Sequence, residues 1–261
     1  MSLPSERFSL ETKRSSLSAS LAPWDTGIFG FPVAQIERFA ILEPESFEFD
    51  YECLETWVNS RNCGMVSCRL GHDRLVESMF LEAKGFRFVE MVLHPEFPDL
   101  HRLQIPDQGL EIAAADESDL TEIRRIAETA FKDGRFHLDP RIDSRLADSR
   151  YGRWVESSLR HPTQQLLKIR DGQTIVGFFI VEIIDDCRAY WHLTAVSPDH
   201  QGKGYGRRTW LAVLQHHVEQ GVAAVSTTIS ARNIAVLNLY SSLNFRFRHP
   251  EMTFHWLRER N

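Results

Sequence analysis

The chain has 261 residues, of which 43% are hydrophobic and 25% are charged, and 36 acidic residues outnumber 30 basic ones. This length allows two small domains or one large domain with a buried core. A net charge of −6 without a basic block argues against nucleic acid or an anionic membrane surface as the main partner. The longest apolar run, Ile175 to Val181, is far shorter than the roughly 20 residues of a membrane-spanning helix. Four cysteines without C-x-x-C spacing predict neither a disulfide framework nor a zinc site, so we expect a cytoplasmic protein without a metal.

The N-terminal segment 1–20 is rich in Ser, is mixed in charge and lacks the apolar stretch of a signal peptide. We therefore expect a flexible arm there. Turn-forming residues gather at Pro95–Pro98 and again at Pro106–Gly109, which is typical of a linker between domains. This spacing predicts an N-terminal domain over residues 21–105 and a second domain over residues 109–261.

Beyond the linker, the hydrophobic pattern predicts helices and strands in a regular order. Apolar residues recur at helical spacing over Asp119–Phe131, and Asp171-Gly172 is a turn typical of a hairpin. In chain order we expect a strand at Leu110–Ala114, helices at Asp119–Phe131 and Tyr151–Leu159, strands at Gln165–Arg170, Thr174–Ile184 and Ala189–Val196, a helix ending at Glu219, a strand at Ala223–Thr228, a helix at Asn233–Leu243 and a closing strand at Phe245–Trp256. This order predicts an α/β (α+β) fold with a mixed, mostly antiparallel sheet flanked by helices.

A short segment repeats on the two sides of the linker. Phe80–Phe88 resembles Leu239–Phe247, and both end in Phe-Arg-Phe after an expected helix end and turn. A duplicated fold with one altered copy explains the repeat, and a chance match over so few residues is the alternative. The first copy has Leu81 where the second has Tyr240, and we find no glycine-rich loop before its helix.

The glycine-rich loop Gln201–Arg208 follows an apolar strand and opens an amphipathic helix. Closely spaced glycines let backbone N–H groups approach a ligand, and a helix N-terminus adds partial positive charge. The combination is suited to a phosphate or a pyrophosphate. The G-x-G-x-G spacing differs from the spacings of dinucleotide-binding folds and of P-loop NTPases, so the sequence disfavours both. From the loop alone, a flexible turn without a ligand is the alternative.

The full string from Thr194 to Arg207 resembles the acetyl-CoA signature of the GNAT superfamily of N-acetyltransferases, a strand ending in V-x-P followed by Q/R-x-x-G-x-G/A. The predicted element order over residues 110–261 is also the order of that superfamily. The resemblance implies a GNAT fold, acetyl-CoA as co-substrate and no metal. Through the repeat, it further implies that the N-terminal half is a truncated, degenerate GNAT-like copy that has lost cofactor binding.

The resemblance also implies which residues contact the cofactor. The backbone of Thr194, Ala195 and Val196 would pair with the pantetheine arm like an added strand. Lys203 would contact a phosphate, and an ordinary solvated cation of the loop is the alternative. Either Arg207 or Arg208 would add positive charge at the rim of the pyrophosphate site. The implied pyrophosphate-binding segment comprises Gln201, Gly202, Lys203, Gly204, Tyr205, Gly206 and Arg207.

Asn233 and Tyr240 lie almost two turns apart on a predicted helix, so they share a face. The opposite stripe of Val236, Leu239 and Leu243 should enter the core. A helical tyrosine beside apolar residues is otherwise an ordinary residue at the core edge. The GNAT resemblance implies instead that Tyr240 is a general acid for the departing CoA thiolate and that Asn233 contacts the cofactor.

The attacking amine has to be neutral, so the reaction needs a base or a water path to solvent. Alternation along the strand predicts that Tyr190, His192, Thr194 and Val196 share one face. His192 lies where some GNAT enzymes place a base, which makes it the candidate general base. A structural histidine is the alternative, and Glu182 on the preceding strand is a second candidate for the base.

Two strings outside the loop narrow the resemblance. Trp24–Gly30 and Ala130–His137 are similar to segments of bacterial sugar-nucleotide N-acetyltransferases, which acetylate the amine of a dTDP-4-amino-4,6-dideoxyhexose. In that case Arg135–His137 and Tyr151–Trp154 would border an acceptor cleft, because arginine and aromatic side chains suit a nucleotide diphosphate. Ordinary surface and helix packing is the alternative for both segments.

The sequence therefore predicts an acetyl-CoA-dependent N-acetyltransferase that acts on a small-molecule primary amine by direct attack, with an amino-sugar nucleotide as the favoured acceptor. A protein, amino-acid, polyamine or aminoglycoside amine is the alternative acceptor. If the protein is not an enzyme, the alternative is a regulatory module that binds acyl-CoA without turnover. We expect no nucleic-acid or membrane partner, and either a monomer or a homodimer.

Overall fold

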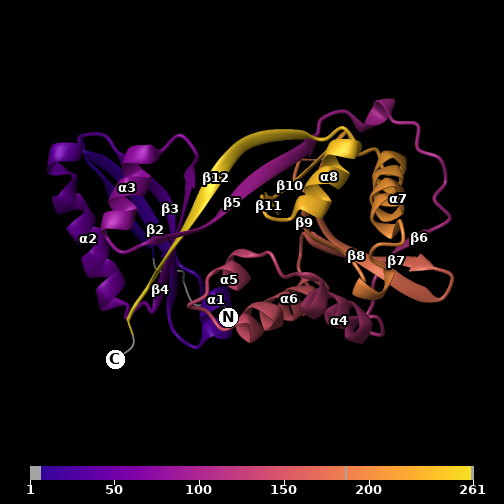
Figure 1. Ribbon diagram of the computed structural model, residues 1–261, viewed down its shortest axis with the longest axis horizontal. Helices are drawn as coiled ribbons and strands as arrows, with labels where there is room; N and C mark the ends of the chain where they lie inside the picture. Colours follow the sequence, from indigo (N-terminus) through magenta and orange to yellow (C-terminus); the bar gives the residue numbers. More distant parts are fainter. Residues whose placement is uncertain (1–6, 186, 260–261) are drawn as a thin grey trace. The chain divides into compact units, whose positions relative to one another are not determined.

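The computed structural model describes residues 7–185 and 187–259. The chain divides into two compact units, one formed by Met1–Val92 with His249–Asn261 and the other by Leu93–Arg248. Two strands, β5 and β12, each begin in one unit and end in the other (Figure 1). Within the described residues, no helix is long and apolar enough to cross a membrane.

The first unit is built on a sheet with the strand order β1-β2-β3-β4-β12. Helices α2 and α3 pack against it over a core that includes Leu17, Phe47, Leu81 and Phe254. Its elements are β1 Arg7–Glu11, β2 Ser15–Leu21, α1 Pro23–Phe29, β3 Val33–Ile41, η1 Pro44–Ser46, α2 Phe47–Ser60, β4 Met65–Gly71, α3 Leu75–Ala83, the start of β5 Arg87–Phe97 and the end of β12 Arg246–Leu257.

The flexible arm expected over residues 1–20 is wrong where the structure describes it, and residues 1–6 lie outside the described residues. Strands β1 and β2 form an antiparallel pair, and Leu17 of β2 is fully buried. The buried Asp50 of α2 accepts a hydrogen bond from the Ser15 hydroxyl at 2.7 Å. The serines that suggested a solvated arm therefore lie in strands that are fixed to the adjacent helix.

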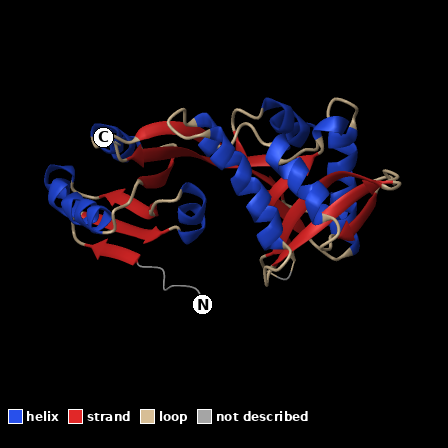
Figure 2. Ribbon diagram, turned by 90° about the horizontal axis from the view of Figure 1, so that it is seen from below, coloured by secondary structure: helices blue, strands red, loops and turns tan. Residues whose placement is uncertain are grey.

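The second unit is built on a sheet with the order β5-β10-β9-β8-β7-β6, and β11 pairs with β5. Helices α7 and α8 cover one face and α4 and α6 cover the other (Figure 1, Figure 2). Of the pairings described, only β9 with β10 is parallel. The elements are η2 Leu100–Arg102, β6 Glu111–Ala114, α4 Leu120–Ala130, α5 Arg135–Leu138, α6 Ser144–Ser158, β7 Gln164–Asp171, β8 Thr174–Ile183, β9 Arg188–Val196, η3 Pro198–His200, α7 Tyr205–Glu219, β10 Ala224–Thr227, β11 Ile229–Ser230 and α8 Ile234–Ser242.

The predicted order of elements is confirmed for this unit, with two differences before β7. The short helix α5 was not expected. Helix α6 begins at Ser144 instead of Tyr151, because the Asp143 carboxylate accepts a hydrogen bond from the Arg145 backbone N–H at 2.9 Å and so caps the first turn. The mixed, mostly antiparallel sheet is as expected.

The two units exchange strands, which the sequence did not predict. The turn-forming residues Pro95–Phe97 belong to β5, where Phe97 pairs with Val225 of β10. Strand β12 follows α8, yet its second half pairs with β4, up to Leu257 opposite Met65. The division of the chain therefore differs from the expected ranges 21–105 and 109–261, since the last residues belong to the first unit.

The repeated segment is also repeated in three dimensions. After α3 the chain turns at Gly85 with φ of 86°, and after α8 it turns at Asn244 with φ of 63°. The first backbone N–H beyond each turn bonds back to the helix, from Phe86 to the Leu81 carbonyl and from Phe245 to the Tyr240 carbonyl, both at 3.0 Å. Leu81 and Tyr240 therefore occupy equivalent places.

The equivalence extends into both sheets and ends at the glycine loop. Strands β3 and β4 pair in parallel over Val33–Ile36, as β9 and β10 do over Arg188–Trp191. In the first unit α2 begins directly after η1, whereas Gln201–Gly204 separates η3 from α7 in the second. The first copy therefore lacks the loop that the sequence associates with a pyrophosphate.

The core of the second unit contains the buried histidine His217, whose Nε2 accepts a hydrogen bond from the Trp191 indole at 2.9 Å. Burial lowers the pKa of His217 to about 4. Below about pH 6.5 His217 therefore takes up a proton in the unfolded chain but not in the folded protein. For this reason we expect the free energy of unfolding to fall as the pH drops from 6.5 towards 4. Between pH 7 and pH 4.5 the loss should be about 2–2.5 kcal/mol, as measured by urea unfolding at the two pH values.

The His217→Gln variant keeps an acceptor for Trp191 but does not titrate. It should lose less stability than the wild type between the two pH values. An equal loss in both proteins would assign the acid sensitivity to other groups.

Candidate active site

The strands β9 and β10 separate halfway along β9. In the described residues, pairing between them ends at Trp191 opposite Thr227, whereas β9 continues to pair with β8 as far as Val196 opposite Gly177. The edge of β9 over Thr194–Val196 therefore has no strand partner on the β10 side. An extended ligand with amide groups is able to pair with such an edge as an added strand.

The close approach of β8 to β9 holds this edge in place. A Cβ on Gly177 would lie 2.6 Å from the Ala195 carbonyl oxygen, so only glycine fits there. At the end of β9 the Gln201 side chain donates a hydrogen bond to the Val196 carbonyl at 3.1 Å. Gln201 thus anchors the start of the glycine loop to the strand.

A β-bulge at His192 changes which side chains share a face of β9. Leu193 pairs with Ile180 and Trp191 with Val181, so His192 is the extra residue. Before the bulge Trp191 packs in the core beneath α7 and α8, whereas beyond it Leu193 packs beneath α4 and α6. The expectation that Tyr190, His192, Thr194 and Val196 share one face is therefore wrong. The residues Tyr190 and His192 face the α4 and α6 side, and the residues Thr194 and Val196 face the α7 and α8 side.

Tyr240 is the most buried residue of α8, at 2% exposed. Its ring packs against Phe245 and Trp210, with centroid distances of 4.7 and 6.2 Å. The expected core stripe is thus incomplete, because α8 turns Tyr240 inward while Val236 and Leu239 are only partly buried.

Polar groups surround the Tyr240 hydroxyl on the α7 and α8 face. Burial raises the pKa of Tyr240 to about 12, against hydrogen-bonding groups of Trp210, Thr194 and Thr227 that lower it. The Trp210 Nε1 is buried without a hydrogen-bond partner of normal geometry in the described part of the chain. Tyr240 therefore stays protonated across the physiological pH range. The Trp210 N–H beside it is able to donate a hydrogen bond to a further acceptor. Sequence reasoning did not find Trp210 or Thr227, because both read as ordinary core residues.

Two glycines of the loop adopt a left-handed backbone. Gly202 and Gly204 have φ of 72° and 83°, the left-handed region that other residues enter at a cost of roughly 1–2 kcal/mol. Gly204 is the residue that precedes α7, and a Cβ on either glycine would meet no protein atom within 4 Å. The loop therefore presents backbone beside open space at a helix N-terminus.

Side chains of the loop make contacts with the protein itself. The Lys203 ammonium donates to the Asp199 carbonyl at 2.8 Å, and the Tyr205 hydroxyl donates to Asp171 at 2.7 Å. Arg207 donates to the Ser242 hydroxyl at 3.0 Å, at the end of α8. These contacts stabilise the loop and tie it to β7 and α8.

Two further residues have structural partners. Arg208 donates to the Gln108 carbonyl at 2.9 Å, and its guanidinium lies over the Tyr205 ring. The Asn233 side chain accepts a hydrogen bond from the Val236 N–H at 3.2 Å and so caps α8.

On the opposite face of β9, His192 and Glu182 form a pair. The His192 Nε2 lies 2.7 Å from the Glu182 Oε2, and both side chains are about one-fifth exposed, at 20% and 23%. Hydrogen bonds from Thr163 and His192 lower the pKa of Glu182, so the carboxylate stays ionised and orients the imidazole. The two separate candidates for the base are thus one hydrogen-bonded dyad.

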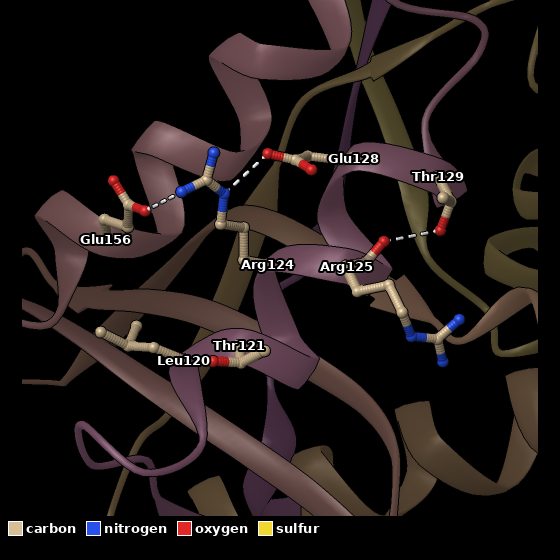
Figure 3. A pocket seen from close by; sticks show the side chains of 7 residues that line it. All are labelled: Leu120, Thr121, Arg124, Arg125, Glu128, Thr129 and Glu156. Carbon is tan, nitrogen blue, oxygen red and sulfur yellow. Dashed lines mark hydrogen bonds and ion pairs between the residues drawn. The ribbon is translucent and has the colours of Figure 1, made fainter.

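A hollow of about 310 Å³ lies elsewhere, along the outer face of α4 (Figure 3). Within it Arg124 donates to Glu128 at 2.7 Å and to Glu156 of α6 at 2.5 Å. Arg125, which also lines the hollow, pairs with Glu122 and Asp199 outside it, and none of the predicted site residues lines the hollow. It is therefore not part of the site around Tyr240. Its lining residues are Leu120, Thr121, Arg124, Arg125, Glu128, Thr129 and Glu156.

Comparisons with known proteins agree with the fold and the glycine loop. Residues 120–245 match the model of the acetyltransferase (GNAT) family. The chain superposes on a GCN5-related N-acetyltransferase from Sphaerobacter thermophilus with a TM-score of 0.64 and 13% identity, covering 95% of this chain and 82% of that one. Over this segment, just under half of the chain, the sequence is similar to the GNAT family. Together the two likenesses confirm the predicted fold class, a mixed α/β fold of the GNAT type.

Two further likenesses concern the whole fold and a part of the sequence. A tandem GNAT protein from the clavulanic acid biosynthesis pathway has a TM-score of 0.61 and 12% identity, covering 98% of this chain and 84% of its own. The mycothiol acetyltransferase of Saccharopolyspora erythraea is 33% identical over 84 residues, which are 32% of this chain and 28% of that protein. The chain thus matches just over a quarter of the length of this curated relative.

Proposed function

We propose that the protein transfers the acetyl group of acetyl-CoA to a primary amine by direct attack. The observation that carries this proposal is the opening beyond Trp191 and Thr227, with Tyr240 on one face and the His192–Glu182 dyad on the other. A thioester at this opening would have a proton donor on one side and a proton acceptor on the other. The family match over residues 120–245 supports the same reaction.

The residues present fit acetyl-CoA. The β9 edge at Thr194, Ala195 and Val196 offers backbone groups to the pantetheine amides, and the loop Gln201–Arg207 offers N–H groups and the positive end of α7 to the pyrophosphate. Among the described residues, the buried Trp210 Nε1 has no hydrogen-bond partner of normal geometry, although it lies near the Tyr240 hydroxyl, which supports a polar group of the ligand there. When bound, acetyl-CoA supplies the activated acyl group.

Tyr240 is the proposed general acid. A phenol with its pKa raised to about 12 keeps its proton at every pH at which the enzyme would work. A thiol has a pKa of about 8.5, so full transfer from the phenol to a free thiolate is uphill. Tyr240 therefore has to give up its proton as the carbon–sulfur bond breaks, when charge on the sulfur is developing.

His192 is the proposed general base, with Glu182 as the group that orients it. The dyad faces α6, where the Trp154 ring centroid lies 6.2 Å from that of His192. Asn233, which caps α8, would act on the cofactor indirectly by fixing the start of the helix that carries Tyr240.

An amino-sugar nucleotide remains the favoured acceptor. The Arg150 guanidinium lies over the rings of Trp154 and Phe136, at 5.4 and 5.1 Å, and Trp154 is the ring that lies near His192. The Arg135 guanidinium lies over Phe136 from α5, at 4.5 Å. Arginines stacked on aromatic rings suit a diphosphate with a base, whereas a polyamine or an aminoglycoside would be repelled by them.

An acceptor panel tests the proposed function. The protein would be incubated with acetyl-CoA and a dTDP-4-amino-4,6-dideoxyhexose, glucosamine, spermine, kanamycin or a lysine peptide, and the released CoA thiol would be measured. The highest kcat/KM is expected for the sugar nucleotide. A preference for a cationic acceptor would keep the reaction and overturn the acceptor. Calorimetric binding of acetyl-CoA without product from any amine would favour the regulatory module.

His192→Gln should lower kcat about tenfold near neutral pH, because the amine then loses its base. The deficit should shrink as the pH rises, since more of the acceptor is already neutral in solution. The Kd for acetyl-CoA should not change, because His192 lies on the other face from the loop. A deficit that is the same at every pH would contradict the role of His192 as base.

The N-terminal half is proposed to be a degenerate GNAT-like copy that has lost cofactor binding. Leu81 stands in the place of Tyr240, and the loop before α2 is missing. Aromatic side chains fill the equivalent region, where Phe39 contacts Phe47 and Phe80. This half would serve the reaction through the strand that it contributes to the second unit.

A further inference from the structure

Three side chains form a hydrogen-bonded row beside the dyad, and none of them has a role in the proposed reaction so far. The Tyr190 hydroxyl lies 2.7 Å from the Thr228 hydroxyl, and that hydroxyl lies 3.4 Å from the His94 Nδ1. The Tyr190 ring meets the His192 ring edge-on, with a centroid distance of 4.8 Å and an interplanar angle of 69°. The row therefore ends against the proposed base.

His94 comes from the exchanged strand. The register of β5 on β10 pairs Phe97 with Val225 and Glu96 with Ser226, and continuing it places His94 opposite Thr228. The strand β5 follows α3, whose end is the first copy of the repeated segment. The row thus joins a residue from the N-terminal half of the sequence to the catalytic strand β9.

We propose that His94 is a positioning residue that acts through Thr228 and Tyr190 to hold the His192 imidazole in place. The inference rests on the proposed function, in which His192 receives the proton of the acceptor amine. It also states what the N-terminal half does for the reaction: its last strand delivers the fixed end of the row.

The hydrogen-bonding groups of the row match in one consistent direction. With its proton on Nε2, His94 accepts at Nδ1 from the Thr228 hydroxyl, and the Thr228 oxygen then accepts from the Tyr190 hydroxyl. Each partly buried hydroxyl therefore has a donor or acceptor assigned. This fixes the ring of Tyr190 on one side of His192, while Glu182 fixes the imidazole nitrogen at 2.7 Å.

Two restraints on one imidazole matter because His192 is the extra residue of a bulge. A bulged residue lacks a cross-strand partner whose side chain would hold it in register. Misplacing a general base by about 1 Å is enough to cost up to about a hundredfold in rate. The row supplies the packing that the strand pairing does not.

The test is a double-mutant cycle on kcat, with the best acceptor of the panel. His94→Leu and Tyr190→Phe should each lower kcat about five- to tenfold near neutral pH, with the KM for acetyl-CoA unchanged. If His94 acts through Tyr190, the double variant should be no slower than Tyr190→Phe alone. His94→Asn, which retains an acceptor at the place of Nδ1, should recover most of the rate.

The outcomes separate this inference from the proposed function. No product from any amine with the wild type would overturn the proposed function and, with it, the inference. A wild-type rate in His94→Leu would overturn the inference alone. Two further results would assign His94 a merely structural role and would also overturn the inference. One is a double variant in which the two losses of rate multiply independently. The other is a loss of rate that follows a fall in melting temperature and that His94→Asn does not recover.

Discussion

Replacing Tyr240 by Phe is expected to lower kcat by about a hundredfold or more while the fold is retained. The ring of Tyr240 fills the core between Phe245 and Trp210, and Phe keeps that ring. The hydroxyl is buried, and burial raises its pKa more than the neighbouring hydrogen-bonding groups lower it. Its loss removes the proposed proton donor to the CoA thiolate. Steady-state kinetics with saturating acetyl-CoA would measure the effect.

Tyr51→Phe is the matched control, because Tyr51 is also a buried tyrosine but lies in the core of the first unit. It should leave kcat unchanged. A Tyr240→Phe variant as fast as the wild type would remove the tyrosine from the mechanism and leave water as the proton donor.

Gly204→Ala should weaken the binding of acetyl-CoA at least about tenfold. An Ala at φ of 83° is strained by roughly 1–2 kcal/mol, so the loop is expected to relax and turn its N–H groups away from the pyrophosphate. Each hydrogen bond to a charged group that is lost in this way is worth about 1.5–3 kcal/mol. Titration calorimetry with acetyl-CoA measures the affinity directly and needs no acceptor.

Gly206→Ala makes the same chemical change two residues later, where the backbone is helical. Its Cβ would lie 3.8 Å from the Leu239 side chain, an ordinary contact, and Ala is compatible with the V-x-P, Q/R-x-x-G-x-G/A pattern. Its Kd should stay within about threefold of the wild type. Equal losses in the two variants would show that the loop does not bind through the backbone of Gly204.

The parts of the site that depend on local pattern are predictable from the sequence. The loop Gln201–Arg208 requires glycines at left-handed positions directly before a helix, and such a requirement is visible in a single chain. Helical spacing places Tyr240 on the predicted helix and the GNAT resemblance suggests its role, but the spacing did not predict that Tyr240 faces the core. The longer helices and strands of the second unit follow from their hydrophobic pattern, whereas the short elements α5 and β11 do not.

The faces of β9 could not be predicted, because a bulge leaves no clear mark in the sequence. Simple alternation puts His192 and Thr194 together, and one extra residue in the ladder puts them on opposite faces of the sheet. The pairing of His192 with Glu182 follows from that same register. Sequence reasoning therefore named both residues of the dyad without joining them.

Strand partners are also set by tertiary structure and not by local pattern. Pro95–Phe97 has the composition of a linker, yet it lies in a strand that pairs with β10. The closing strand β12 has the expected length and position, but its sequence does not indicate that it pairs with β4. His94 was missed for this reason, as its significance depends on the neighbour that β5 acquires.

The exchange of β5 and β12 has a consequence for the history of the chain. Under the proposed duplication, an inactive copy would ordinarily be free to shrink or disappear. The strand pairings count against such a loss, because removal of the N-terminal half would take away β5, on which β10 pairs, and leave β12 without β4. Single residues of the proposed first copy could then change, as we propose for Leu81, while selection on the second unit keeps its strands.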